Sequence, residues 1–249
     1  MCRMFVQREL NEARTLVLPG RVAHVVAGPE DGVGDLSVSL AMIAPGRMNS
    51  HRHWPAGEAM YAAAGHGRVW IEGLAVELQP GTAAFAPPCL LHNAENSGTD
   101  DLVIVGAFCP AAIPGSYVET PPIFEPTGLL HSVEHLHRSV PLESLGDTTV
   151  SVIPLISDLE LSPHVSMRLV RVAAGEDYHV DVSSRARVRV VTNGSGSLRT
   201  LQKSSRLTLW STIIAADTQL DIESGRSGLS MVEIEPHLDR EHLSTVPCP

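Results

Sequence analysis

Two histidines and a glutamate lie close together in the stretch GRMNSHRHWPAGEAMYAAAG. Alternate side chains of a β-strand share a face, so His51 and His53 project together while Arg52 points away. Glu58 returns to that face after the turn sequence WPAG, and a second stretch, GTAAFAPPCLLHNAEN, supplies His92. Three imidazoles and one carboxylate that converge inside a barrel suit a divalent first-row transition metal.

The energetics of burial favour a metal site over a polar surface. A lone HxH on a strand is typical of a strand whose polar side chains face solvent, but here Glu58, His92 and the flanking glycines are in register with it. Three histidines and a carboxylate left together in an apolar interior are costly unless something compensates them. A bound cation does so, and this donor set leaves one or two coordination positions open, which is typical of catalytic metal sites.

The elements that must position these residues are short strands. Apolar runs rich in Val, Ile, Leu and Thr recur at close spacing, as in DLSVSLAMIAPG, GRVWIEG, LAVELQPG, TAAFAPP and DLVIVGAF. They are too short for typical helices and too regular for loops, so they predict an all-β sandwich or barrel. The most helix-like piece, residues 128–146, lies between two β-rich halves, and we interpret it as a connector.

The two halves look like copies of each other. SVSLAMIAPG matches SMRLVRVAAG, and AAAGHG matches VTNGSG. Gly46 and Gly175 are 129 positions apart, and so are Gly65 and Gly194. Two separate glycine pairs that share one gap-free offset indicate an internal duplication.

The histidine-containing motifs resemble those of the cupin superfamily, whose first motif is a glycine, HxH, a glutamate and a closing glycine. The second motif is a glycine, a proline, a histidine and an asparagine. The matching positions, within residues 35–110, are Gly46, His51, His53, Glu58, Gly65, Gly81, Pro87, His92 and Asn96. The resemblance implies a double-sheet jelly roll, with His51, His53, Glu58 and His92 as metal ligands. One departure is Cys89, where the family usually has glycine.

The second half has lost these ligands. The offset of 129 leads from His51, His53 and Glu58 to Val180, Val182 and Arg187, and His92 corresponds to Gln219 or Asp221. We therefore expect a second lumen packed with apolar side chains and without a metal. The chain resembles a bicupin with a metal-binding N-terminal cupin and a degenerate C-terminal cupin.

The fold class that follows is all-β, with two tandem double-stranded β-helix (jelly-roll, cupin) barrels and a short, partly helical connector. The expected divisions are a metal-binding cupin domain at 1–115, a connector at 116–150, a degenerate metal-free cupin domain at 151–240 and a C-terminal tail at 241–249. The two barrels are expected to pack like the dimer that single-barrel relatives often form.

Composition excludes several classes of partner. The chain has a net charge of −10, and Lys203 is the only lysine. With no basic cluster to neutralise a run of phosphates, nucleic acid is not expected as a partner. No apolar stretch is long enough for a secretory signal or a membrane span, so we expect a cytoplasmic protein without a membrane partner. A homodimer of the whole chain is left open.

The cysteines are scattered. Cys2, Cys89, Cys109 and Cys248 form no CxxC pair, so free thiols are expected rather than a disulfide framework or a cysteine zinc site.

Further residues are candidates for the pocket. Met48, Met60, Ala62 and Phe85 are expected to line it, and proximity alone suggests Tyr61, His66 or Cys89 as a general base. Asn96 is interpreted as support for its turn. A second histidine-rich cluster lacks the flanking glycines of the two motifs, and we assign it a solvated or packing role. Its members are His131, Glu134, His135 and His137. The motif strands carry no inward arginine or lysine, so a small dianion such as oxalate lacks an evident counter-charge, and the small side chains leave room for a larger substrate.

Three functions remain open. The first is a metal-dependent enzyme on a small or medium organic substrate with enol, keto or carboxylate oxygens, most simply an oxidoreductase of the non-haem dioxygenase type. The second is a non-redox cyclase or isomerase, because FCPAAIPGSYVET faintly resembles a segment of cupins associated with aromatic polyketide cyclisation. The third is a metabolite-binding cupin without turnover. The cofactor is one divalent transition metal, Fe, Mn, Ni, Cu or Zn, whose identity the sequence leaves open.

Overall fold

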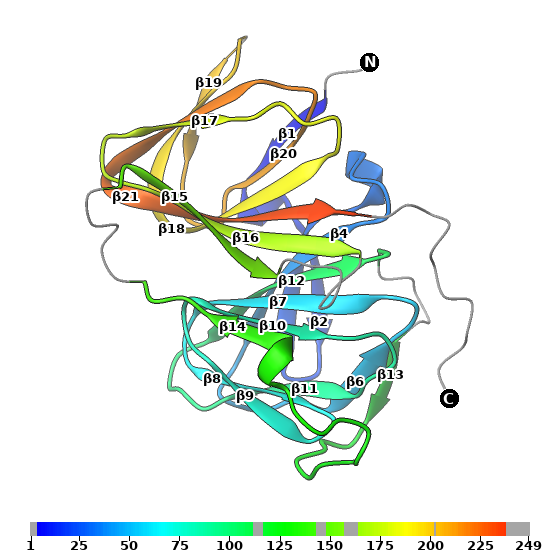
Figure 1. Cartoon of the computed structure of the whole chain (residues 1–249). Helices are drawn as coiled ribbons and strands as arrows, with labels where there is room; N and C mark the ends of the chain where they lie inside the picture. Colours follow the sequence, from blue (N-terminus) through cyan, green and yellow to red (C-terminus); the bar gives the residue numbers. More distant parts are fainter. Residues whose placement is uncertain (1–3, 112–116, 143–147, 157–163, 202, 238–249) are drawn as a thin grey trace.

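The structure is a computed structural model that describes residues 4–111, 117–142, 148–156, 164–201 and 203–237. Nearly all regular structure within them is β, arranged in two lobes that stack on each other (Figure 1). The predicted all-β fold of two jelly rolls is confirmed. Among the described residues, no helix has the length and apolar character that crossing a membrane requires.

The first lobe consists of two sheets. The interface sheet, which faces the second lobe, has the strand order β14-β10-β7-β12-β4-β3-β2. The outer sheet has the order β13-β6-β11-β8-β9, with β5 beside β11. The strand bounds are β2 Arg14–Leu18, β3 Arg21–Ala27, β4 Ser37–Ile43, β5 Gly46–Arg47, β6 Ser50–His53, β7 Gly57–Ala64, β8 Gly67–Ile71, β9 Leu74–Leu78, β10 Thr82–Ala86, β11 His92–Asn96, β12 Leu102–Cys109, β13 Tyr117–Thr120 and β14 His137–Ser139.

The second lobe has the strand order β1-β20-β18-β21-β16-β15, with β17 beside β21 and β19 beside β18. The bounds are β1 Met4–Arg8, β15 Val150–Ile156, β16 Val165–Val172, β17 Asp177–Val180, β18 Arg187–Arg199, β19 Ser204–Leu207, β20 Thr212–Ala216 and β21 Leu220–Pro236. Strands β18 and β21 are long and shift register on either side of Gly194, so each runs through both layers of its jelly roll. Three short 3-10 helices complete the described elements, η1 Leu10–Glu12, η2 Pro29–Asp31 and η3 Glu134–Leu136.

The two lobes repeat the same topology. Strand β15 begins and ends 129 residues after β3, and the pairing of β3 with β4 recurs as β15 with β16. The pairing of β7 with β12 recurs between β18 and the C-terminal part of β21. The predicted duplication is therefore present in the strand pairing as well as in the glycines.

The lobes exchange their leading strands. Strand β1 precedes the first lobe in sequence but pairs with β20 of the second, and Figure 1 shows it in blue beside that strand. Strand β14 precedes the second lobe but pairs with β10 of the first. Because each leading strand covers an edge of the other lobe's sheet, neither lobe is complete without the other.

The structure of the connector differs from the helix that its sequence pattern indicates. Residues 128–146 contain only the 3-10 turn η3 and the strand β14 in their described part, which excludes 143–147. Leu136 is buried against the first lobe, whereas Leu129 is exposed. The open edge of β10 supplies backbone hydrogen-bond partners to β14, and this pairing outweighs the local helical spacing.

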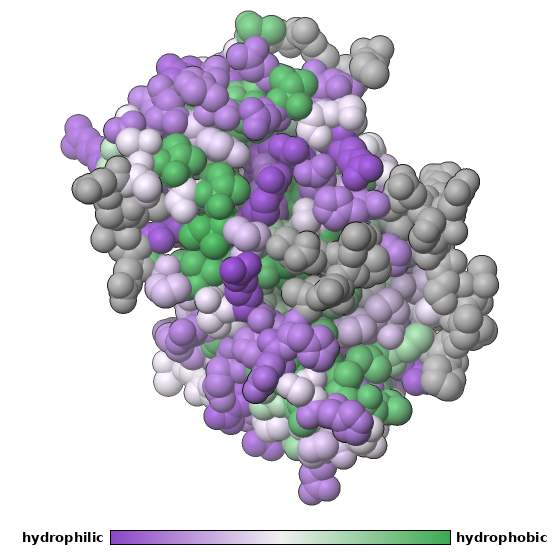
Figure 2. Space-filling model, in the orientation of Figure 1, coloured by the Kyte–Doolittle hydropathy of each residue, from purple (hydrophilic) through white to green (hydrophobic). Residues whose placement is uncertain are grey.

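The largest core cluster lies between the lobes. It joins Leu40, Ala59 and Val105 of the interface sheet to Leu169 and Val232 of β16 and β21. A second cluster fills the space between the two sheets of the first lobe, and a third fills the second jelly roll. On the face shown in Figure 2, hydrophilic residues cover most of the described surface and the hydrophobic residues form separate patches. Apolar area is thus concentrated at the junction of the lobes.

Leu169→Ala tests the shared core. Leu169 has no exposed surface, so its truncation leaves a cavity and lowers the free energy of unfolding by about 2–5 kcal/mol. Leu201→Ala is the matched control, because Leu201 is 76% exposed and its truncation changes stability by less than about 0.5 kcal/mol. Urea denaturation followed by circular dichroism measures both. Equal effects of the two substitutions would contradict a core shared between the lobes.

Candidate metal centre

Strands from both sheets of the first lobe hold the four donors. His51 and His53 lie on β6, and His92 begins β11, directly opposite His51 in the antiparallel pairing. Glu58 lies on β7 of the interface sheet. The three histidines are at most 6% exposed, and the four donor atoms lie within 4.8 Å of one another. These side chains form a buried group that could hold a metal ion.

One carboxylate oxygen is the meeting point of the three imidazoles. Glu58 Oε2 lies 3.0 Å from His92 Nε2 and 3.3 Å from His53 Nε2. Its distance to His51 Nε2 is 3.8 Å. The ring centroids of the histidines are 4.4 to 5.4 Å apart. All three histidines therefore direct Nε2 toward one point.

Burial and hydrogen bonding set the charges of the group. Burial is the largest cause that lowers the pKa of His51, to about 3, and it also lowers the pKa of His53. Burial by itself raises the pKa of the Glu58 carboxyl, but hydrogen bonds with the three histidines outweigh it and hold that pKa well below its usual value. Neutral His51 and His53 around an ionised carboxylate are in the protonation state in which these residues bind metals.

The contact between His92 and Glu58 provides a test of metal fit. His92 Nδ1 lies 2.9 Å from the carbonyl oxygen of Leu90, so Nδ1–H donates to that carbonyl. A neutral imidazole has one N–H, which leaves a lone pair on Nε2 facing the Glu58 carboxylate at 3.0 Å. Two acceptors at this distance require a proton or a cation between them. A metal-binding histidine commonly donates its other N–H to a backbone carbonyl, so the arrangement fits a metal ligand.

Strand β12 provides the space around the carboxylate. A Cβ added at Gly106 would lie 3.1 Å from Glu58 Oε1, so the glycine leaves room for the side chain. Phe108, two residues further along, packs edge-on against the His53 ring with centroids 4.9 Å apart. Neither residue was identified from the motifs, because both lie outside the cupin pattern.

A cavity of about 530 Å³ opens onto the metal centre between the two sheets. The four candidate ligands lie on its wall, and most of the remaining lining is aliphatic. The exposed residues Leu16 and Pro29, from β2 and η2, also line it. This volume falls within the range of about 300–1,000 Å³ that is usual for pockets of small organic ligands. It agrees with the expectation of a substrate larger than a two-carbon acid.

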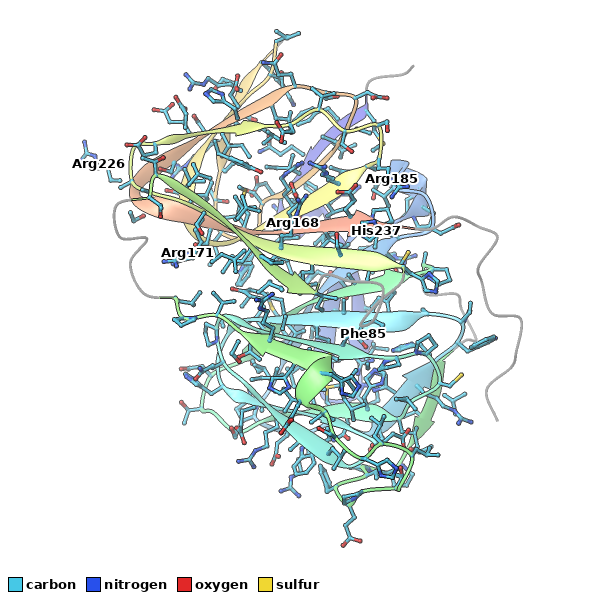
Figure 3. The ribbon with its side chains drawn as sticks, viewed as in Figure 1. Phe85, Arg168, Arg171, Arg185, Arg226 and His237 are labelled. Atoms are coloured by element: carbon cyan, nitrogen blue, oxygen red, sulfur yellow. The ribbon has the colours of Figure 1, made fainter. Side chains whose placement is uncertain are left out.

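The predicted pocket residues divide between two faces. Met48 and Met60 line the cavity. Ala62 is buried in the core between the two sheets and does not line the cavity in the described residues. Phe85 belongs to the core between the lobes, and Figure 3 shows it at the junction. Every side chain of β10 is buried, so the apolar pattern could not indicate which face Phe85 occupies.

The three candidates for a general base lie away from the cavity. Tyr61 is adjacent to Met60 on β7 and faces the core between the lobes, where burial raises its pKa to about 12. His66 is exposed on the turn after β7. Cys89 is disulfide-bonded, so the expectation of a free thiol is wrong for it. Pairing depends on the fold rather than on spacing in the sequence, and Cys109 is free and buried as expected.

The turn residues have structural roles. Asn96 donates to the carbonyl oxygens of Ile43 and Asp100 and accepts from the backbone N–H of Gly98, so it supports the turn as expected. Cys89 has a positive φ of 71°, which explains why glycine is usual at this position.

The side chains of the second histidine cluster are not grouped as metal ligands are. His131, Glu134 and His135 are exposed, and His137 Nδ1 donates to the carbonyl oxygen of Val133. Among the residues described, the group at His51, His53, Glu58 and His92 is the only one arranged for a metal ion.

A cation also lines the cavity. Arg21 on β3 lies on its wall, and its Nη1 is 3.8 Å from the Sδ of Met48. The motif strands do lack an inward arginine. The expectation that the cavity has no counter-charge for an anion was wrong, because β3, which begins with Arg21, pairs with β4 in the same sheet. The alternation of Arg21, Ala23 and Val25 along one face of β3 is the signal that could have identified it.

The corresponding positions in the second lobe lack the ligands. The strand register places Val180 at the position of His51 and Leu220 at that of His92, and both are buried. The sequence offsets, which gave Gln219 or Asp221 for His92, missed by one residue. Val182 is 59% exposed and not in the lumen, because β17 ends at Val180.

The second lumen is apolar only in part. Arg187 and Glu235 lie 2.8 Å apart, and the fully buried Arg189 and Glu233 lie 2.5 Å apart. Arg168 also pairs with Glu233, and Figure 3 shows it within the upper lobe. By the shared register, Arg187 occupies the position of Glu58 and Glu233 that of Gly106. Ion pairs thus replace the metal centre here, which corrects the expected all-apolar lumen.

His92→Ala is expected to release the metal. Loss of even an outer partner of a metal ligand weakens binding by about 10–100-fold, so loss of His92 itself should cost at least about tenfold. Elemental analysis of protein purified without added metal, and titration of the apoprotein, measure the effect. His66→Ala is the control, because His66 is exposed and outside the cavity. Equal metal content in both variants would contradict the site.

Gly106→Ala is expected to weaken metal binding without unfolding the protein. Its new Cβ at 3.1 Å would displace the Glu58 carboxylate by a few tenths of an ångström. Gly98→Ala is the matched control, because its Cβ would lie 3.3 Å from Asn96 Oδ1, away from the cavity. Titration of the apoprotein with Zn²⁺ compares the two. If Gly98→Ala weakened binding as much as Gly106→Ala, the role assigned to Gly106 would be wrong.

Comparison with known proteins agrees with this geometry. Residues 39–108 match the cupin domain family, and no curated protein matches the chain. Salicylate 1,2-dioxygenase from Pseudoaminobacter salicylatoxidans, solved as adducts with gentisate, has a TM-score of 0.64 at 12% identity, covering 94% of this chain and 81% of that one. Oxalate decarboxylase from Bacillus subtilis has a TM-score of 0.65 at 15% identity, covering 92% and 75%. The 7S globulin of Momordica charantia has a TM-score of 0.69 at 12% identity, covering 94% and 84%.

At these identities the similarity to solved structures concerns the fold. The family match covers the first lobe, and the repeated strand pairing shows that the second lobe has the same topology. Residues 39–108 of the first lobe thus match the cupin domain family, and the whole chain has the fold of the two-domain structures to which it is similar; the first lobe carries a group that could hold a metal ion, and the second lobe, where described, carries none.

Proposed function

We propose that this protein is a metal-dependent enzyme that acts on a medium-sized organic substrate with enol, keto or carboxylate oxygens, and that its reaction is a non-haem oxygenation. The observation that carries the proposal is the contact of His92 Nε2 with the Glu58 carboxylate, which requires a proton or a cation between them, at the wall of a cavity of about 530 Å³. A buried donor set beside an accessible cavity is typical of catalytic metal sites.

The protein's own contribution is to hold and enclose the site. His51, His53 and His92 with Glu58 would occupy four positions around a first-row metal and leave one or two for substrate. The bound metal would supply a Lewis acid that chelates adjacent substrate oxygens and, if redox-active, brings dioxygen to them. The largely aliphatic walls lower the local dielectric constant and thereby strengthen electrostatic interactions beside the candidate ligands.

The absence of an evident general base favours oxygenation over proton-transfer chemistry. Apart from the four candidate ligands, the titratable residues of the described cavity wall are Arg14, Arg21 and Glu30. Arg14 and Glu30 are exposed, and arginine remains protonated. A cyclisation or isomerisation that depends on a positioned base would have no such group beside the centre in the described residues.

Oxygen consumption distinguishes the candidate functions. The apoprotein is loaded with Fe²⁺ or Zn²⁺ and supplied with a panel of salicylate, gentisate and hydroxynaphthoates. Oxygenation predicts oxygen uptake and product with Fe²⁺, no product with Zn²⁺, and loss of both on His53→Ala. His135→Ala, at an exposed histidine outside the site, serves as the control.

Other outcomes would contradict the proposal. Product formation with Zn²⁺ in the absence of oxygen would indicate the cyclase or isomerase. Binding of panel compounds without turnover, unchanged in His53→Ala, would indicate a non-catalytic binding protein.

A further inference from the structure

Arg21 is the cation of the cavity that lies beyond the motif strands. It begins β3, and the alternation of that strand carries Arg21, Ala23 and Val25 on the cavity wall. Its Nη1 lies 3.8 Å from the Sδ of Met48, which also lines the cavity. The guanidinium is therefore anchored beside an apolar wall residue of the first lobe.

Arg21 lies on the wall of the same cavity as the four candidate ligands, His51, His53, Glu58 and His92. One molecule bound in that cavity can therefore contact both the guanidinium and the ligand group.

The charge balance of the cavity favours an anion. A divalent cation bound to the Glu58 carboxylate would retain one net positive charge, and the guanidinium of Arg21 lies on the wall of the same cavity. The other charged residues of the wall, Arg14 and Glu30, are exposed and opposite in sign, so they offset each other. The whole chain carries −10, so this interior would be positive within an acidic protein. A low-dielectric cavity strengthens its attraction for an anionic ligand.

The rest of the wall defines the body of the ligand. Leu18, Val25, Ile43 and Ile104 contribute aliphatic surface, and Phe108 contributes a ring edge. A volume of about 530 Å³ greatly exceeds what a two-carbon dianion needs. The occupant should therefore be apolar over most of its surface and charged at one end.

We propose that Arg21 is a specificity-determining residue that binds the carboxylate of the substrate, and that the substrate is a largely apolar carboxylic acid whose further oxygen reaches the metal centre. This inference rests on the proposed function and names its substrate class. Arginine suits the role because its planar fork binds a carboxylate through two parallel hydrogen bonds.

The test compares an acid with its neutral amide. Calorimetry measures binding of 3-hydroxy-2-naphthoate and 3-hydroxy-2-naphthamide to the Zn²⁺-loaded full chain. The wild type should prefer the acid by about tenfold or more, as expected for hydrogen bonds to a charged group. Arg21→Gln should bring the ratio close to one, and Arg21→Lys should retain part of the preference. Arg47→Gln is the matched control, because Arg47 pairs with Glu95 outside the cavity and should keep the wild-type ratio.

The opposite results are equally specific. An unchanged acid-to-amide ratio in Arg21→Gln, equal affinities in the wild type, or no binding of either compound would overturn the role of Arg21. Metal content, measured on every variant, should remain at the wild-type level. Acid binding that depends on Arg21 but gives no turnover with any metal would contradict only the proposed function. Turnover of neutral substrates that Arg21→Gln leaves unchanged would contradict only the role of Arg21.

Discussion

The central strands β7, β10 and β12 of the interface sheet are mostly buried on both faces, and this constraint determines where Glu58 lies. Along β7, Glu58 and Met60 face the cavity while Ala59 and Tyr61 face the core between the lobes. A shift of one residue in the pairing of β7 with β12 would exchange these two sets and place the carboxylate in an apolar core. Because both sets pack tightly, the second lobe fixes the register that aims Glu58 at the three histidines.

Both lobes bury charged side chains at corresponding positions, and these charges are compensated differently in each lobe. In the first, ionised Glu58 is surrounded by imidazole donors, and Gly106 leaves space beside it. In the second, Arg187 stands at the position of Glu58 and Glu233 at that of Gly106, so charges from neighbouring strands pair with each other. Buried ion pairs compensate these charges without a metal but leave no open coordination position. The same scaffold thus carries a candidate reactive centre in one lobe and a closed ionic cluster in the other.

Sequence reasoning succeeded where local spacing determines geometry. The alternation of His51 and His53 on one strand and the glycine frame around them were sufficient to place the donors, because strand periodicity is a local property. It failed where both faces of a strand are apolar, as for Phe85. An unbroken apolar run does not indicate which face of the sheet a given side chain occupies. Arg21 was missed because the neighbours of β3 are set by long-range pairing with β4. The pairing of β1 with β20 and of β14 with β10 is likewise non-local, and no sequence motif indicates it.

The core between the lobes explains why a lobe without metal ligands is still required. The outward faces of β4, β7 and β12 present Leu40, Tyr61 and Val105, which would form an extended apolar surface if left uncovered. Large exposed apolar patches on sheets invite aggregation, and the second lobe removes this one by supplying Leu169 and Val232. The packing face of the second lobe is therefore constrained by the first, whereas its lumen is free of any requirement to bind a metal. The candidate metal centre lies one strand thickness from this junction, so the stability of the junction limits how far Glu58 can move from the three histidines.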